Sequence, residues 1–307
     1  MFQLKRISNP ILEPITTNAW ESQAVFNPAA IREGEHVHLI YRAVEGDNYS
    51  TLGYAKLDRA GKILERWPAP ILRRETAQEQ RGVEDPRVAK FDGRYYLVYV
   101  AYDGATVRTC LASTKDFKTI TKHGIIIPEV WDKDAMFFPE PVKGNLLLLH
   151  RIEPNIQLAF FNDLEQMLKP EKDYWTKHFA ALDQYTVMRP KYEWEARKIG
   201  GGAPPIPTKE GWLVIYHGVD DKLVYRAGAA LLDYDNPLKV IARFPEPILA
   251  PERQFEKVGD VPNVVFPTGT AIFDDELLVY YGAADKVIGM ATASLDELLH
   301  ELKRHKV

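Results

Sequence analysis

The sequence repeats one pattern of short apolar strands five times along almost its whole length. The first strand of each copy is an apolar run, and the five runs occupy residues 36–43, 94–101, 145–152, 211–218 and 276–283. A second strand rich in small residues follows each run. A period of roughly 50 to 65 residues built only of short strands is typical of a radial array with one sheet per repeat. The sequence therefore predicts an all-β fold, a five-bladed β-propeller that forms a single domain over residues 1–307.

A proline-containing phrase also recurs, and each copy precedes a new repeat. The copies occupy residues 10–14, 68–75, 124–129, 185–195 and 245–252, of which the fourth is the weakest match. An edge strand tolerates proline because one of its sides is unpaired, so the phrase predicts the outer strand of the preceding sheet with its crossing loop. No such phrase follows the last repeat. We therefore expect the N-terminal copy to complete the fifth sheet and close the ring.

The C-terminal end predicts a short helix after Ser294. Ser294 stands three residues before Glu297, which is the spacing of a capping box. A leucine stripe with helical spacing follows, made of Leu295, Leu298, Leu299 and Leu302. Residues 163–184 form the longest interval without repeat signal, which indicates a helical or loop insertion near the mouth of the channel. We assign no chemistry to this insertion.

Composition and charge exclude several classes of protein. The 307 residues carry a formal net charge of -4, which gives no basis for binding nucleic acid or an anionic membrane. No apolar run approaches the roughly 18 residues of a membrane span, and residues 1–10 lack the apolar core of a signal peptide. The single cysteine, Cys110, lies in a predicted strand, where we expect a buried, inert thiol. One cysteine excludes a disulfide framework and fits a reducing cytoplasm, where we expect the protein to reside.

The segments just before the first strands have an unusual composition for strands that face a narrow channel. They contain proline, glycine and charge, and they occupy residues 25–30, 82–93, 132–144, 198–211 and 264–276. Asp85 is the best catalytic candidate, because a carboxyl group in a confined channel has a raised pKa that suits a general acid. In an extended chain Arg87 shares the face of Asp85 and opposes that shift. The alternative interpretation is that Asp85 caps a turn before Pro86.

Basic side chains are expected near the ends of the channel strands, and their convergence would form an oxyanion site. The set is Lys133, Arg151, Lys198 and His217, with Arg42 and Tyr225 as further members. Arginine binds phosphate at two points, and lysine adds a point charge. The glycine run 200–202 lacks the Lys-Ser/Thr of a nucleotide loop and opens no helix. The pattern indicates a site for free phosphate, although each of these residues alone is more often a solvated surface charge.

A further polar set has the chemistry of a sugar site. It consists of Asn27, Asp134, Glu140 and Asp285. Amide and carboxylate groups suit sugar hydroxyls, and aromatic rings supply apolar faces. The aromatic candidates are Trp131, Phe138 and Tyr281, although most aromatic residues of the chain belong to the core.

These residues resemble glycoside hydrolase family 130, the β-mannoside phosphorylases and their relatives, over almost the whole chain. The most specific segments are 82–87, 138–140, 150–151, 198–205 and 215–218. The resemblance implies a five-bladed propeller in which Asp85 is the general acid. It implies that phosphate is held by Arg151, Lys198, His217 and Tyr225. It also implies that the mannosyl unit contacts Asn27, Arg42 and Asp285.

The pair Lys133-Asp134 departs in part from the family pattern. Many members carry a basic residue followed by asparagine at this place, so Lys133 still fits phosphate binding whereas a sugar contact by Asp134 is left open. Members that hydrolyse rather than phosphorolyse lack much of the basic set. Its presence here favours phosphorolysis.

The leading hypothesis is therefore an inverting glycoside phosphorylase. Phosphate attacks the anomeric carbon of a β-mannoside while Asp85 protonates the departing sugar, in the family through a hydroxyl of the mannosyl ring. The products are α-mannose 1-phosphate and a shortened acceptor. An inverting glycosidase needs an acid and a base, whereas phosphate is already an anionic nucleophile and has only to be held. We expect no metal and no organic cofactor, with inorganic phosphate as the co-substrate.

Two alternatives stay open. One is hydrolysis, with Asp85 as the acid and Glu140 or Asp285 as the base. The other is a non-catalytic carbohydrate-binding propeller. The linkage (β-1,4 or β-1,2) and the acceptor (mannose, glucose or N-acetylglucosamine) depend on loops at the channel mouth, which vary freely. The expected partners are a β-linked mannoside and inorganic phosphate, not nucleic acid or membrane, and a homo-oligomer is left open.

Overall fold

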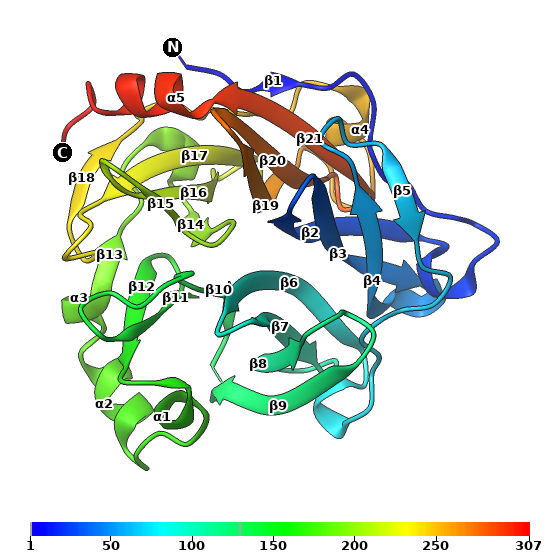
Figure 1. Ribbon diagram of the computed structural model, residues 1–307, viewed down its shortest axis with the longest axis horizontal. Helices are drawn as coiled ribbons and strands as arrows, with labels where there is room; N and C mark the ends of the chain where they lie inside the picture. The colour runs from blue at the N-terminus through cyan, green and yellow to red at the C-terminus, as the bar shows by residue number, and fades with distance from the viewer. Residues whose placement is uncertain (1, 129) are drawn as a thin grey trace.

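Strands dominate the fold, and in the computed structural model their sheets lie around a common centre (Figure 1). The structure describes residues 2–128 and 130–307. Met1 and Glu129, the last residue of the third proline phrase, lie outside the described residues. Within the described part the strands form four sheets, which contain five consecutive antiparallel units. The mostly-β class that the sequence predicts is confirmed.

The five units follow one another along the chain. Unit 1 comprises β2 (Ala24–Glu33), β3 (His36–Glu45), β4 (Tyr49–Leu57) and β5 (Ile63–Arg66). Unit 2 comprises β6 (Gly82–Phe91), β7 (Arg94–Tyr102), β8 (Val107–Thr114) and β9 (Ile120–Ile127). Unit 3 comprises β10 (Asp132–Phe137), β11 (Leu146–Ile152), β12 (Ile156–Phe161) and β13 (Thr186–Met188). Unit 4 comprises β14 (Lys198–Gly201), β15 (Ile206–Thr208), β16 (Gly211–Val219), β17 (Tyr225–Leu232) and β18 (Val240–Arg243). Unit 5 comprises β19 (Val265–Phe273), β20 (Glu276–Ala283), β21 (Val287–Ser294) and the N-terminal β1 (Lys5–Arg6).

The first strand of each unit lies nearest the centre (Figure 1). These inner strands, β2, β6, β10, β14 and β19, are the segments that carry proline, glycine and charge in the sequence. Contacts join β19 to β2, β2 to β6, β6 to β10 and β10 to β14. Units 1 and 2 count as one sheet because the single parallel bridge between Ser50 and Gly82 links them. The polar segments therefore face one another at the centre.

Three of the five proline phrases differ from their expected role. The outer strands β5 and β18 end before their phrases begin, while β9 and β13 only overlap theirs. In units 2 and 3 the phrase therefore does contribute to the outer strand, as expected, because residues 124–127 belong to β9 and β13 lies within the phrase 185–195. The other three phrases make isolated bridges to β21, β4 and β17, through Leu12 with Ile288, Leu52 with Leu72, and Ala227 with Leu249. Proline has no backbone N–H and cannot continue a ladder, which limits each of these three phrases to such short contacts. The N-terminal segment does complete unit 5, because β1 pairs with β21, although through residues 5–6 rather than 10–14.

Helices are short and lie outside the sheets. They are α1 (Leu164–Leu168), α2 (Tyr174–Ala180), α3 (Leu182–Tyr185), α4 (Gln254–Lys257) and α5 (Leu295–Leu302). Single 3-10 turns are η1 (Ala19–Glu21), η2 (Gly46–Asn48), η3 (Ala77–Glu79) and η4 (Glu193–Glu195). The predicted C-terminal helix is confirmed as α5, because the Ser294 side chain accepts a hydrogen bond from the Glu297 backbone N–H. The insertion is helical and contains α1, α2 and α3. Among the described residues no helix is both long and apolar enough to cross a membrane.

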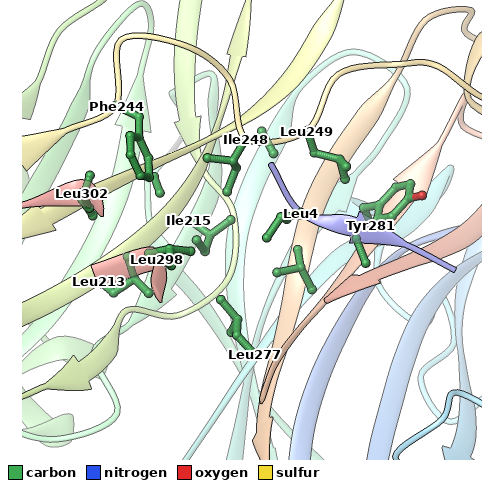
Figure 2. Packing of buried hydrophobic residues seen from close by; sticks show 14 of the residues in the cluster. Leu4, Leu213, Ile215, Phe244, Ile248, Leu249, Leu277, Tyr281, Leu298 and Leu302 are labelled. Atoms are coloured by element: carbon green, nitrogen blue, oxygen red, sulfur yellow. The ribbon is translucent and has the colours of Figure 1, made fainter. Parts of the chain in front are cut away.

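The core is divided into clusters that lie between neighbouring units. Figure 2 shows the cluster between units 4 and 5, where Leu213 and Ile215 of β16 lie near Leu277 of β20, and Leu298 of α5 belongs to the same cluster. Similar clusters join units 1 and 2, units 2 and 3, and units 3 and 4. A further cluster joins unit 5 to unit 1. The expected burial of Cys110 is also observed, and burial raises the pKa of its thiol to about 12.

Candidate active site

Three consecutive inner strands present a polar side chain at the same irregularity. The ladders of β2, β6 and β10 shift register at Asn27, Asp85 and Asp134. Each of these residues has a positive φ, of 46°, 50° and 62° respectively. Asparagine and aspartate enter the left-handed region more readily than other side chains, and a bulge re-aims the side chain that it carries. The repeated bulge therefore explains why these three strands deliver polar groups to one place.

A cavity of about 270 Å³ lies at this place. Its lining consists of Asn27, Arg42, Asp85, Trp131, Lys133, Asp134, Arg151, Lys198, His217, Tyr225, Val261, Val264, Phe266 and Asp285. Asp85 and every member of the predicted phosphate and sugar sets except Glu140 line this cavity, whereas two of the three aromatic candidates do not. Trp131 retains 55% exposure and stands at the edge of the cavity, whereas Asp85 is buried.

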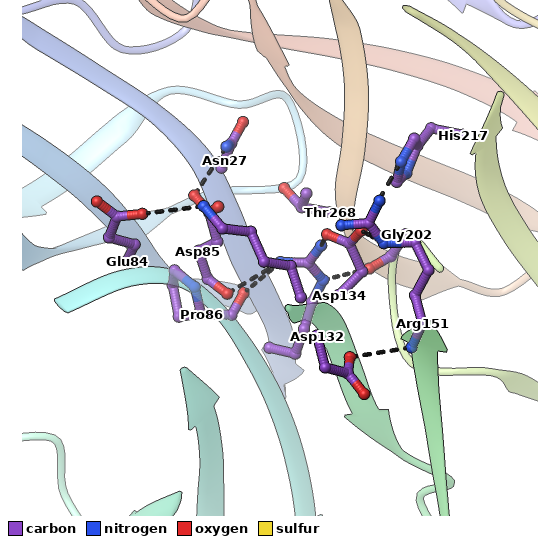
Figure 3. Close-up of polar contacts among 12 residues, drawn as sticks. Asn27, Glu84, Asp85, Pro86, Asp132, Asp134, Arg151, Gly202, His217 and Thr268 are labelled. Atoms are coloured by element: carbon purple, nitrogen blue, oxygen red, sulfur yellow. Dashed lines mark hydrogen bonds and ion pairs between the residues drawn. The ribbon is translucent and has the colours of Figure 1, made fainter. Parts of the chain in front are cut away.

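The carboxyl group of Asp85 has close polar partners on neighbouring strands. Asn27 Nδ2 donates a hydrogen bond to Asp85 Oδ1 at 2.8 Å (Figure 3). Arg42 Nη1 lies 3.5 Å from the same oxygen, while Arg42 Nη2 lies 2.8 Å from Glu84 Oε1. Lys133 Nζ lies 3.4 Å from Glu84 Oε2. Units 1, 2 and 3 thus share one network of charges around Asp85.

This network corrects the expected ionisation of Asp85. Burial raises the pKa of the Asp85 carboxyl, but Arg42, Lys133, the Asn27 hydrogen bond and Arg87 together lower it below the usual value. The sequence-based expectation of a raised pKa was wrong, because the cations come from strands that are distant in the sequence. Asp85 is therefore ionised at neutral pH in the free protein.

Arg87 has a different place from the one that the strand alternation indicates. It is buried behind the cavity lining and donates to the backbone carbonyls of Asp85, Pro86 and Gly202. Its Nη2 also lies 3.5 Å from Asp134 Oδ1. The guanidinium holds the Asp85 bulge in place, because its hydrogen bonds join the backbone of unit 2 to the backbone of unit 4.

On the opposite side of the cavity, two carboxylates hold the cations together. Arg151 Nε lies 3.0 Å from Asp134 Oδ2, and Arg151 Nη1 lies 2.5 Å from Glu153 Oε1. Lys198 Nζ lies 2.7 Å from the same Glu153 oxygen. Glu153 was not predicted from the sequence, although its position two residues after Arg151 places both on one face of an extended segment. The side chain of Asp134 serves this ion-pair network in the structure.

His217 lies against this network as a neutral ring. Its Nε2 atom is 3.8 Å from Asp134 Oδ2, and its ring stacks with that of Tyr225 at 5.9 Å between centroids. Burial lowers the pKa of His217 to about 3, with Asp134 opposing the shift and Arg151 and Lys198 adding to it. Burial likewise raises the pKa of Tyr225. Both side chains are therefore uncharged hydrogen-bonding groups at neutral pH, not cations.

Asp285 is a second carboxyl group in the cavity, and its ionisation differs from that of Asp85. Burial raises the pKa of Asp285 to about 6; Arg42 opposes this shift and Asp85 adds to it. Its φ of 50° is again left-handed. Two carboxyl groups whose surroundings move their pKa values apart are typical of sites with acid–base chemistry.

Three sequence-predicted residues lie away from the cavity. Glu140 is exposed and accepts a hydrogen bond from the Tyr234 hydroxyl at 2.7 Å. It follows the end of β10 at Phe137, so the strand carries it to the end opposite Asp134. Phe138 is a core residue that packs edge-on against Trp212, and Tyr281 is a core residue that donates to Glu256. Of the aromatic candidates, only Trp131 reaches the cavity.

A polar cavity that holds cations together with two carboxyl groups of different ionisation has the features of an enzyme active site. The family model described as beta-1,4-mannooligosaccharide phosphorylase matches residues 3–304. The chain belongs to glycoside hydrolase family 130, the β-mannoside phosphorylase family.

Individual relatives agree with this assignment. The chain is 43% identical over 310 residues to a 1,2-beta-oligomannan phosphorylase of Thermoanaerobacter sp. (strain X514), which covers 97% of this chain and 99% of that protein. It is 42% identical over 316 residues to a beta-1,2-mannobiose phosphorylase of the same strain, with the same coverage. The solved structure of beta-1,2-mannobiose phosphorylase from Listeria innocua, in complex with beta-1,2-mannobiose, superposes with a TM-score of 0.84. That protein is 26% identical, and the match covers 98% of this chain and 99% of that one.

Proposed function

We propose that this enzyme cleaves β-mannosides with inorganic phosphate and inverts the anomeric configuration, so that α-mannose 1-phosphate is released. The observation that carries the proposal is the cation group of Lys133, Arg151 and Lys198, which lines the same cavity as Asp85. Phosphate is an anion that has to be held and aligned rather than deprotonated. Arg151 and Lys198 supply the charge, and neutral His217 and Tyr225 supply hydrogen bonds.

The bond changes follow from this arrangement. A phosphate oxygen bonds to C1 of the mannosyl unit as the bond between C1 and the leaving oxygen breaks. The proton reaches the leaving oxygen from Asp85 by way of a mannosyl hydroxyl, and Asp85 returns to its carboxylate form. Asn27, Arg42 and Asp285 hold the mannosyl ring beside Asp85.

The lowered pKa of Asp85 places a condition on this mechanism. A carboxylate cannot donate a proton, so Asp85 must gain one when the substrates bind. Bound phosphate offsets the positive charge of the lysine and arginine side chains in the cavity. Because those charges lower the pKa of Asp85, phosphate binding raises it again.

The same observations weigh against hydrolysis and against a purely binding role. Glu140 is exposed and hydrogen-bonded to Tyr234, which disfavours it as the base that a hydrolase needs. The other candidate base, Asp285, lines the cavity, so the phosphate dependence of turnover has to decide between phosphate and an Asp285-activated water as the nucleophile. A carbohydrate-binding module has no use for a buried group of cations, because mannosides are uncharged and burying charge costs free energy.

We further propose that residues 1–307 form a single catalytic domain, a closed five-bladed β-propeller. The pairing of β1 with β21 and the apolar cluster between units 5 and 1 support closure. Closure also accounts for the meeting of inner strands from all five units at one cavity, since an open array of sheets would leave the outer two units apart.

For the linkage we propose a β-1,2-mannoside. Two relatives that match the full chain at 43% and 42% identity are a 1,2-beta-oligomannan phosphorylase and a beta-1,2-mannobiose phosphorylase. The family model carries a β-1,4 description, so both linkages have to be compared directly.

The test compares both linkages with and without phosphate. The protein is incubated with β-1,2-mannobiose or β-1,4-mannobiose, and mannose 1-phosphate and free mannose are measured. We expect phosphate-dependent release of mannose 1-phosphate, with the larger kcat/KM for the β-1,2 substrate. Asp85→Asn should lower kcat by about a thousandfold while the protein stays folded. Wild-type-like turnover by Asp85→Asn removes Asp85 from the mechanism, and faster cleavage of the β-1,4 substrate refutes the proposed linkage.

A further inference from the structure

A buried triad of glutamate, tyrosine and a basic side chain recurs in four units among the described residues. The triads are Glu21–Tyr41–Arg66, Glu79–Tyr99–Lys122, Glu195–Tyr216–Arg243 and Glu256–Tyr281–Arg6. In each, the tyrosine hydroxyl and the cation both donate to one glutamate. The glutamate lies in a short helical turn before the inner strand, and the cation lies on the outer strand. The triad therefore ties the entry of each sheet to its outer edge.

Unit 3 has a different set of side chains at this place. His150 on β11 corresponds to the tyrosines, because it stands directly before the cavity residue Arg151 as Tyr41 stands before Arg42 and Tyr216 before His217. His150 Nδ1 lies 2.7 Å from Asp132 Oδ2, and His150 Nε2 lies 2.9 Å from His178 Nε2. All three side chains are buried. His178 belongs to α2, in the helical insertion.

The hydrogen bonds of this relay converge on the Asp132 carboxylate. That carboxylate accepts from the backbone N–H of Arg151 and from Nδ1–H of His150. Between His150 Nε2 and His178 Nε2, one ring nitrogen has to donate and the other has to accept. Burial and the neighbouring His150 lower the pKa of His178 to about 3, which keeps the His178 ring neutral. A polar partner on the insertion is thus required for a satisfied relay.

The other end of the relay reaches the cavity strands. Asp132 Oδ1 accepts a hydrogen bond from the backbone N–H of Arg151 at 3.0 Å. Arg151 is in turn the register partner of Lys133 across β10 and β11. The relay therefore fixes the backbone from which two of the proposed phosphate ligands project. In Figure 3 Asp132 meets the Arg151 backbone while the Arg151 side chain extends toward Asp134 and His217.

We propose that the helical insertion, α1 to α3, positions the phosphate site through the relay His178–His150–Asp132. The inference rests on the proposed function of Arg151 and Lys133 as phosphate ligands. His178, His150 and Asp132 are positioning residues, since the cavity lining does not include them. Second-layer hydrogen bonds of this kind orient charged ligands in other binding sites, and small displacements of such ligands are costly.

The first test removes the polar partner of His150 while keeping a ring of similar volume. In His178→Phe the Nε2 atom of His150 loses its hydrogen-bond partner, and we expect the KM for phosphate to rise about tenfold. The KM for the mannoside should change by less than about twofold, because Asn27, Arg42 and Asp285 lie on other units. His178→Gln supplies an amide group, which can donate or accept, and should restore most of the phosphate affinity.

A matched control separates positioning from general destabilisation. Tyr99→Phe removes the equivalent hydrogen bond of unit 2, where the following residue is Val100 and does not line the cavity. We expect a lower Tm for Tyr99→Phe with an unchanged KM for phosphate. If His178→Phe and Tyr99→Phe change the KM for phosphate equally, the relay has no specific link to the site and the proposal is overturned.

Two further variants keep the result decisive. Asp132→Asn preserves size but replaces one of the two accepting oxygens by an N–H donor, so either His150 Nδ1–H or the Arg151 backbone N–H loses its acceptor. This variant should therefore raise the KM for phosphate by a similar factor even if His178→Phe does not fold. An unchanged value in folded Asp132→Asn overturns the proposal.

Arg151→Gln tests separately whether Arg151 binds phosphate at all. If Arg151→Gln leaves the KM for phosphate unchanged, the proposed phosphate site fails, whereas a raised value in Arg151→Gln alone refutes only the role of the insertion.

Discussion

Asp85 and Asp285 line the same cavity, yet their pKa values shift in opposite directions. Both carboxyl groups are buried, which raises the pKa of each. Asp85 also accepts from Asn27 and lies beside Arg42 and Lys133, so its negative form is stabilised. At Asp285 the nearby cations offset less of the effect of burial, and the pKa of its carboxyl rises to about 6. At neutral pH the site therefore holds one well-stabilised carboxylate and one whose ionisation is costly.

Replacing Asp285 should make the protein more stable at neutral pH. The folded-state pKa of about 6 lies above the ordinary value of 3.8, so the folded protein binds the proton more tightly than the unfolded chain. The stability of the wild type consequently falls as pH rises from about 4 to about 6. Asp285→Asn removes this cost, and we expect it to add on the order of 1–3 kcal/mol above pH 6, with no gain below pH 4.

Urea unfolding of both proteins between pH 4 and pH 8 measures this difference. The same variant should lose activity, since Asp285 contacts the proposed mannosyl site. A constant stability difference at every pH would show that the ionisation of Asp285 is not its cause.

At the scale of the element, the inner strands depend on close backbone approach as well as on bulges. Gly200 of β14 is the register partner of His217. A Cβ atom at position 200 would lie 2.4 Å from His217 Cε1 and 2.7 Å from Asp134 Oδ2. Both contacts are too short, so any side chain at position 200 displaces the His217 ring and the Asp134 carboxylate, which lie beside the proposed phosphate ligands.

Gly200→Ala should therefore raise the KM for phosphate about tenfold, while the KM for the mannoside stays nearly constant. Phosphate titrations of the initial rate measure both effects. Gly46→Ala is the control, because a Cβ atom at position 46 meets no atom within 4 Å. An unaltered phosphate response in folded Gly200→Ala would mean that His217 does not bind phosphate.

Much of the cavity could be predicted because its residues fall at fixed places in the repeat. Asn27, Asp85 and Asp134 occupy the same bulge of successive inner strands, and the pattern of the sequence reveals that alignment. Glu153 escaped notice, and Arg87 was expected at a different place, because the contacts of both side chains depend on partners in other units. The sign of the pKa shift of Asp85 was missed for the same reason. Sequence periodicity aligns positions within the repeat but gives no distances between repeats.

The buried triads illustrate the same limit at the level of the sheet. In each triad the glutamate and the tyrosine are at least 20 positions apart, and the glutamates look like ordinary capping residues in the sequence. Three of the five proline phrases misled in the opposite way, since each forms a short bridge outside the outer strand, whereas the phrases of units 2 and 3 do contribute to that strand. Both the partners of these glutamates and the place of the proline phrases depend on contacts between segments that are distant in the sequence. Such contacts follow from packing and cannot be read from the residues next to the motif.

For the whole molecule, the N-terminal segment contributes a strand, an apolar side chain and a cation to the last unit. Leu4 belongs to the cluster between units 4 and 5. Arg6 Nε lies 2.8 Å from Glu256 Oε1, and the Glu256 side chain is fully buried. These contacts tie the beginning of the chain to its end. If the ring is closed as proposed, the stability of the protein should be sensitive to changes at this terminus.

Arg6→Met should lower the free energy of unfolding by about 2 kcal/mol, because it leaves a buried carboxylate without its cation. Arg59→Met is the matched control: Arg59 also pairs with two carboxylates of unit 5, but at the surface, and its loss should have a much smaller effect. Urea unfolding followed by tryptophan fluorescence gives both values. Equal effects of the two variants would argue against a structural role of the N-terminal strand in closure.

The central claim is that phosphate, not water, is the nucleophile in this cavity. The most direct measurement follows the products by NMR during cleavage of β-1,2-mannobiose at varied phosphate concentration. We predict one equivalent of α-mannose 1-phosphate for each bond cleaved, and a rate that falls to zero as phosphate is removed. Release of free mannose from both halves of the disaccharide at an undiminished rate in phosphate-free buffer, or formation of the β-anomer of the phosphate, would contradict the account.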